Sequence, residues 1–190
     1  MTISRRTLFR ISGGALASAV GIGSATQALA APAVVGLKGL DTRTLSFDCV
    51  NTGEKLNKIT YWADGEYDRA ALAEISKALR DWHSGDVYPI EPKLLDALHR
   101  LGRSMDTNCR FELTSGYRSP ETNAKLHEVD HGVAEHSLHM KGQATDITLP
   151  GRPLRKVYEA AVAMRAGGVG YYPASNFIHV DIGPVRRWAG

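Results

Sequence analysis

Residues 137–146 read Ser-Leu-His-Met-Lys-Gly-Gln-Ala-Thr-Asp and place His139 and Asp146 seven positions apart. A second stretch, Phe-Ile-His-Val-Asp-Ile-Gly at residues 177–183, contributes His179. Imidazole nitrogens and carboxylate oxygens are ligands of Zn²⁺, and a catalytic zinc site commonly has three protein ligands and a water molecule in the fourth position. We therefore predict that His139, Asp146 and His179 bind zinc.

The segments around these two stretches alternate between predicted strands and predicted helices. Runs with alternating apolar residues, bounded by turn residues, indicate strands. The candidate ligands then lie at strand ends and in adjoining loops, where sites are often held by a rigid scaffold. We expect strands at residues 111–115, 143–149, 169–172 and 177–182, and an earlier hairpin formed by 43–50 and 55–62.

Four segments have apolar residues at helical spacing, and two of them begin with a recognisable start signal. Asp68 is a candidate N-cap, and Pro92 is a candidate first-turn proline. Together with the strands, these segments predict an α+β fold with a small antiparallel sheet and about four helices. We expect helices at residues 68–83, from 92 to about 101, at 120–128 and at 153–166.

The N-terminal segment has the features of an export signal. Arg5 and Arg6 form a twin-arginine pattern of the kind that the bacterial Tat pathway recognises. A mildly apolar stretch follows and ends in Ala-Leu-Ala at 28–30, which is typical of a signal-peptidase site. We expect a signal peptide at residues 1–30, a flexible leader at 31–42 and one domain at 43–190, located in the periplasm.

Composition limits the partners of this domain. The chain of 190 residues has a net charge of +3, and residues 1–30 hold three arginines and no acidic residue, so the remainder is formally neutral. Nucleic-acid-binding domains normally present a basic face, so we predict no nucleic-acid partner. No segment after residue 30 is apolar enough to span a bilayer. The domain is expected to be a monomer.

Two cysteines, Cys49 and Cys109, leave two alternatives open. An oxidising compartment permits a disulfide between them. The alternative is two separate buried thiols, since Tat substrates usually fold in the reducing cytoplasm before export. Their spacing is unsuitable for a cysteine-based zinc site.

Three sequence blocks together resemble a known family. They are the Ser-x-His-x-x-Gly-x-Ala-x-Asp pattern at 137–146, Ser-Gly-Tyr-Arg-Ser at 115–119, and a Gly-Gly-Val-Gly-Tyr-Tyr block at 167–172 followed by 177–183. The combination resembles the zinc D-Ala-D-Ala carboxypeptidase-like peptidases of family M15, and most of all their murein endopeptidase branch. The resemblance covers roughly residues 67–188 and implies the corresponding LAS-type fold.

The resemblance also implies roles for individual residues. His139, Asp146 and His179 correspond to the family's zinc ligands. Arg118 corresponds to an arginine thought to hold the scissile carbonyl or a substrate carboxylate. His136 has no counterpart in the family pattern, and we interpret it as a loop residue, with a spare metal ligand as the alternative.

One position departs from the family pattern. Many relatives have a glutamate three residues before the last histidine, where it acts as general base, and this chain has Asn176 there. Asp181 is the nearest substitute, because it lies two residues after His179 on the same strand face. It is either the base or a partner that orients a ligand.

The resemblance implies an exported zinc endopeptidase that cuts peptide cross-links or stem peptides of peptidoglycan. A D,D- or L,D-carboxypeptidase of stem peptides is the alternative within the same class. A catalytically silent wall-binding module is a rival from another class, which Asn176 keeps open.

Overall fold

The structure is a computed structural model that describes residues 41–129 and 133–190. The expected signal peptide and residues 31–40 of the expected leader lie outside the described residues. Within the described ranges, none of the helices has the length and apolarity needed to cross a bilayer.

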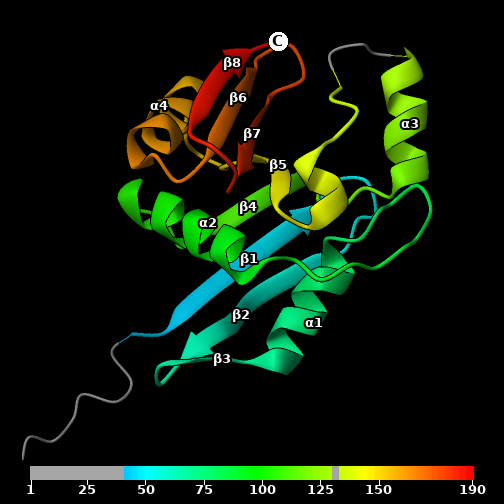
Figure 1. The fold of residues 1–190 in the computed structure, drawn as a ribbon. Coiled ribbons are helices and arrows are strands. Elements are labelled where there is room, and N and C mark those ends of the chain that lie inside the picture. The colour runs from blue at the N-terminus through cyan, green and yellow to red at the C-terminus, as the bar shows by residue number, and fades with distance from the viewer. Residues whose placement is uncertain (1–40, 130–132) are drawn as a thin grey trace, which may run out of the picture. The chain divides into compact units, whose positions relative to one another are not determined.

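Eight strands in the described part of the chain form one sheet in the order β3-β2-β1-β4-β5-β7-β6-β8 (Figure 1). The pairs β1/β4 and β6/β8 are parallel, and the other neighbours are antiparallel. The strands are β1 (Arg43–Cys49), β2 (Lys55–Ala63), β3 (Glu66–Tyr67), β4 (Arg110–Ser115), β5 (Ala144–Thr148), β6 (Gly168–Tyr172), β7 (Phe177–Asp181) and β8 (Arg186–Ala189).

The sheet of eight strands is larger than the small antiparallel sheet that we expected, and it is mixed because two of its seven strand pairs are parallel, whereas the α+β class with four α-helices is correct. Parallel neighbours need a long crossover connection, and the chain between β1 and β4 supplies one because it contains two helices. The chain end then returns as β8 beside β6, a strand that the sequence patterns did not reveal.

The helices begin where their start signals predicted. The Asp68 carboxylate accepts hydrogen bonds from Ala70 N and Ala71 N at 2.8 and 3.0 Å, and Pro92 occupies the first turn of the second helix. The first helix is shorter than expected, because the chain turns away after it and folds around a buried aspartate described below. The helices are α1 (Arg69–Ala78), α2 (Pro92–Ser104), α3 (Pro120–Val129), α4 (Leu154–Met164) and the 3-10 helix η1 (Leu138–Lys141).

Helix α2 supplies the centre of the core. It packs against β1 and α4, while α1 packs against β2 and α4 against β6 and β7 (Figure 1). Phe47 of β1 and Phe111 of β4 meet beside it with ring centroids 6.3 Å apart. Full burial of each such side chain contributes about 1.5–3 kcal/mol. The four leucines of α2 are fully buried: Leu94, Leu95, Leu98 and Leu101.

The two cysteines are separate buried thiols. The Cys49 thiol lies 3.5 Å from the carbonyl oxygen of Ala78, and the Cys109 thiol lies 3.5 Å from that of His99. Burial raises the pKa of both thiols. The second of the two sequence alternatives is therefore correct.

Candidate metal centre

Three neighbouring elements bring His139, Asp146 and His179 together. Asp146 on β5 and His179 on β7 are directly paired across the two antiparallel strands. His139 comes from η1, which precedes β5 and contacts it. Gly142 ends η1 in the left-handed conformation, with φ at 62°, and so lets the chain turn from η1 into β5.

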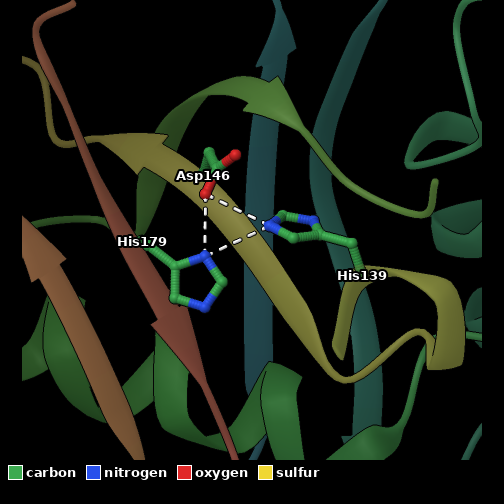
Figure 2. Close-up of side chains that lie close together, drawn as sticks. All are labelled: His139, Asp146 and His179. Atoms are coloured by element: carbon green, nitrogen blue, oxygen red, sulfur yellow. Dashed lines mark hydrogen bonds and ion pairs between the residues drawn. The ribbon is translucent and has the colours of Figure 1, made fainter. Parts of the chain in front are cut away.

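The donor atoms of these three side chains form a nearly regular triangle (Figure 2). His179 Nδ1 lies 3.0 Å from Asp146 Oδ1 and 3.1 Å from His139 Nε2, and the third side is 3.3 Å. Two ligands on a tetrahedral zinc ion, each bound at 2.0–2.1 Å, are separated by about 3.3 Å. The spacing of the triangle therefore fits a metal ion of this size.

The second nitrogen of each imidazole indicates which tautomer faces the triangle. His139 Nδ1 lies 2.6 Å from the carbonyl oxygen of Gly116, an acceptor, so Nδ1 carries the proton. His179 Nε2 lies 3.0 Å from the carboxylate of Asp181 and carries the proton by the same reasoning. With these tautomers, two nitrogen lone pairs and a carboxylate oxygen converge on one point. A cation would relieve their mutual repulsion, so the chemistry of this donor set fits a metal ion.

Burial and charge act in opposite directions on these groups. Burial lowers the pKa of His139, and the nearby Asp146 carboxylate offsets this decrease only in part. Burial also opposes the charged forms of Asp146 and His179, but their charged and hydrogen-bonded neighbours prevail. His139 and His179 hold the pKa of Asp146 below its usual range, and Asp146 and Asp181 raise the pKa of His179. Metal ligands must be deprotonated, so we expect metal binding to release protons from this cluster.

Asp181 is fully buried, and both of its carboxylate oxygens are occupied. Oδ1 accepts from the backbone N–H groups of Gly168 and Gly183, each at 2.8 Å, and from Arg186 Nη1 at 3.2 Å. Oδ2 accepts from His179 Nε2 at 3.0 Å and from Arg186 Nη2 at 2.7 Å. Burial alone would raise the pKa of Asp181, but these contacts keep this pKa below its usual range. The geometry suits a group that orients His179 rather than one that takes a proton from water.

Arg118 lies in the turn after β4, and its guanidinium approaches the triangle at Asp146. Its Nη2 lies 3.4 Å from Asp146 Oδ2 and 3.2 Å from Ser115 Oγ, and its backbone N–H donates to the carbonyl oxygen of His139 at 3.3 Å. The guanidinium therefore places a positive charge next to the candidate metal centre.

The turn that carries Arg118 is tied to the end of α1. Tyr117 N donates to the carbonyl oxygen of Leu79 at 2.7 Å. A Cβ added to Gly116 would lie 2.8 Å from Leu79 Cβ and closer still to the Leu79 carbonyl, so only glycine fits there. The approach of the turn to α1 places the Gly116 carbonyl where it accepts from His139.

A buried carboxylate, that of Asp81, strengthens the same connection. It accepts from the backbone N–H of Ser119 at 2.9 Å and from that of His83 at 2.9 Å. Burial alone would raise the pKa of Asp81, but hydrogen bonds from Thr122, Ser119 and His83 hold it well below its usual range. Asp81 thus joins the loop after α1 to the residue that follows Arg118.

Asn176 lies next to the cleft in sequence but does not line it. It is the left-handed residue of the turn between β6 and β7, with φ at 54°. The Asn176 carbonyl accepts a hydrogen bond from Thr148 Oγ1. The neighbouring residues Ser175 and Phe177 line the cleft beside the metal centre, whereas Asn176 does not line it.

This cleft has a volume of about 720 Å³ and contains the triangle together with Arg118. His136 also lines it but is not among the described acidic, histidine and cysteine residues whose donor atoms converge, so the spare-ligand alternative finds no support. Sequence reasoning missed Arg186 and did not place Trp188 in the cleft, although both line it. The only available signal was their position shortly after the histidine block.

Comparisons with known proteins indicate the family of this chain. The profile of a family described as peptidoglycan L,D-endopeptidase MepK matches residues 38–188. A relative named peptidoglycan L,D-endopeptidase MepK from Escherichia coli is 39% identical over 185 residues, covering 97% of each chain. A relative from Haemophilus influenzae, named as a probable enzyme of the same kind, is 42% identical over 149 residues, covering 78% of this chain and 80% of its own. No solved structure matches this chain significantly.

This α+β chain, with its histidine–aspartate–histidine cluster, is thus a member of the M15 peptidases. Within them it belongs to the family described as peptidoglycan L,D-endopeptidase MepK. The family resemblance inferred from the three sequence blocks is confirmed, and the predicted murein endopeptidase activity agrees with the names of these relatives.

Proposed function

We propose that this chain is a metal-dependent peptidoglycan endopeptidase that hydrolyses peptide cross-links or stem peptides in the bacterial cell wall. The observation that carries the proposal is the convergence of two imidazole lone pairs and one carboxylate oxygen, 3.0–3.3 Å apart, in a cleft that also holds Arg118. Membership of a family named for such an activity supports the substrate class.

Zinc is the metal that we propose, with His139, Asp146 and His179 as its ligands. Two nitrogens and one oxygen at this spacing are suited to zinc, although other divalent metals bind the same donor types. When bound, such an ion polarises the scissile carbonyl and lowers the pKa of a water molecule.

The protein's own residues supply orientation and charge. Asp181 accepts from Nε2–H of His179 and so leaves its Nδ1 unprotonated, and the Gly116 carbonyl accepts from Nδ1–H of His139 and so leaves its Nε2 unprotonated. Arg118 is positioned to stabilise negative charge that develops on the scissile carbonyl, or to hold a substrate carboxylate. We therefore assign Asp181 to positioning and Arg118 to direct contact with substrate.

We also propose the cellular setting that the sequence suggests. The chain would be exported by the twin-arginine pathway, lose residues 1–30 and act in the periplasm as a monomer, with residues 43–190 as its single catalytic domain. The LAS-type arrangement of its sheet and helices belongs to the same proposal.

The test is digestion of purified muropeptide dimers, with and without a chelator, read by mass spectrometry. We expect dimers to be converted to monomers, chelation to stop the conversion, and added zinc to restore it. Dimers left intact but with shortened stems would instead indicate a carboxypeptidase. Unchanged dimers in the presence of one bound metal per chain would indicate a wall-binding module.

A further inference from the structure

We propose that Arg186 and Trp188 form a second anion-binding subsite of the cleft, which recognises a free carboxylate of the stem peptide beside the scissile bond. The inference rests on the proposed function and names the feature of the substrate that this side of the cleft selects. In cross-links between diaminopimelate residues, each residue keeps a carboxylate that is available for such recognition.

Glycines in β6 create the space for this subsite. The parallel pairing of β6 and β8 sets Gly168 opposite Arg186 and Gly170 opposite Trp188. A Cβ at Gly170 would lie 2.7 Å from Trp188 Cε2, and a Cβ at Gly168 would overlap the Arg186 guanidinium. The glycines of the Gly-Gly-Val-Gly block therefore let both side chains lie close against β6.

The donors of Arg186 are only partly used. A guanidinium has five N–H groups. Nη1 donates to Asp181 Oδ1 at 3.2 Å and to the carbonyl oxygen of Pro184 at 3.1 Å, and Nη2 donates to Asp181 Oδ2 at 2.7 Å. The Nε–H and the second N–H of Nη2 have no partner among the described residues, and they lie on one edge of the group. Two parallel N–H groups on one edge match the geometry of a carboxylate.

Two contacts fix the orientation of the Arg186 guanidinium. The adjacent edge, formed by Nη1 and Nη2, is held by the fully buried Asp181, and the guanidinium carbon lies 5.0 Å from the ring centroid of Trp188. Trp188 Nε1 in turn donates to the hydroxyl oxygen of Tyr172 at 2.8 Å. The Arg186 side chain nevertheless remains 44% exposed and lines the cleft, so a ligand in the cleft can approach it.

The subsite adjoins the candidate metal centre. The Trp188 ring lies 5.2 Å from the ring of His179, and both line the cleft together with Arg118. The cleft thus has one guanidinium near Asp146 and a second near His179. A substrate that places its scissile carbonyl at the metal centre and a carboxylate next to it satisfies both groups.

The test compares two ligands that differ only in this charge. A synthetic stem peptide ending in diaminopimelate, and the same peptide with only the side-chain carboxylate of diaminopimelate amidated, are titrated by calorimetry against the metal-loaded protein. Charge-assisted bidentate hydrogen bonds are strong, so the wild type should bind the acid about 10–100-fold more tightly than the amide. Equal affinities would overturn the proposal without any variant.

Two substitutions assign the preference to a residue. Arg186→Lys keeps a positive charge beside Asp181 but removes the planar fork, so it should reduce the acid-to-amide ratio to about threefold or less. Arg187→Lys is the matched control, because Arg187 points to the other face of the same strand, and its ratio should equal that of the wild type. Metal content should be unchanged in both proteins. A ratio that persists in Arg186→Lys and disappears in Arg118→Lys would overturn the proposal.

The outcome is separable from that of the proposed function. Cleavage of dimers without an acid preference would reject this subsite alone. An acid preference that depends on Arg186, in a protein that cleaves no dimer, would establish the subsite and reject the endopeptidase proposal.

Discussion

Replacing Asp181 by asparagine tests whether this residue orients a metal ligand or takes part in proton transfer. An asparagine oxygen in place of Oδ1 would still accept from Gly168 N and Gly183 N, both 2.8 Å away. The amide nitrogen in place of Oδ2 would then face two donors, His179 Nε2 and Arg186 Nη2. His179 can avoid this conflict by moving its proton to Nδ1, which removes the lone pair directed at the metal.

The size of the effect follows from these contacts. Loss of a hydrogen-bonding partner behind a metal ligand typically costs 10–100-fold in affinity, or about 1.4–2.8 kcal/mol. The free energy of unfolding of the metal-free protein should fall by about 1–3 kcal/mol, less than for a fully buried ion pair, because Arg186 is 44% exposed and can be hydrated.

Competition with a chromophoric chelator measures the metal affinity, and urea denaturation measures stability. Asp48→Asn is a matched control, because Asp48 also accepts two hydrogen bonds from an arginine, at 2.7 and 2.8 Å from Arg110, but lies on β1 outside the cleft. Its metal affinity should equal that of the wild type. Native metal affinity combined with loss of turnover in Asp181→Asn would refute the reasoning and assign the residue to proton transfer.

Three further predictions concern two residues that support the site and the two buried thiols. The pKa of Asp81 is lower in the folded protein than its unfolded value of about 4, so its ionisation stabilises the fold above about pH 4 and this contribution is lost as the pH falls toward the folded pKa. In urea titrations, the free energy of unfolding of Asp81→Asn should decrease less steeply with falling pH than that of the wild type. The same decrease in both proteins would contradict this prediction. Gly116→Ala should lower the free energy of unfolding by about 1–3 kcal/mol and reduce turnover, because its Cβ would crowd Leu79; denaturation and muropeptide digestion measure both, and a stable, active variant would be evidence against it. Cys49 and Cys109 should both resist a thiol reagent in the native protein and both react after unfolding without reductant, whereas a missing thiol would indicate a disulfide.

Local sequence signals predicted much of the fold correctly. The cap at Asp68, the proline at position 92 and the apolar periodicity of α2 depend on neighbouring residues only, so they could be recognised without tertiary information. The donor set could be recognised because His139 and Asp146 lie in one distinctive motif at 137–146 and His179 lies in a second block at 177–183. The structure brings these three together as expected, and metal binding itself stays a prediction.

The remaining features depend on contacts between distant segments. Strand β8 is four residues long, mostly exposed and without apolar alternation, so only its pairing with β6 defines it as a strand. The occupied oxygens of Asp181 and the burial of Asp81 likewise result from partners that come from separate loops and strands. A carboxylate in a sequence cannot be assigned to catalysis or to positioning until these partners are known, which is why two roles stayed open for Asp181.

The asparagine at position 176 gives a last prediction about catalysis. A residue at φ 54° lies in the left-handed region, where asparagine is tolerated better than most side chains, and the neighbouring Ser175 and Phe177 face the cleft instead. Introducing a glutamate by Asn176→Glu should therefore cost about 1 kcal/mol of stability without increasing turnover. Kinetics on muropeptide dimers and urea denaturation measure the two effects. A tenfold increase in kcat would show that position 176 reaches the reacting water, and would reopen the search for the base at the β6–β7 turn.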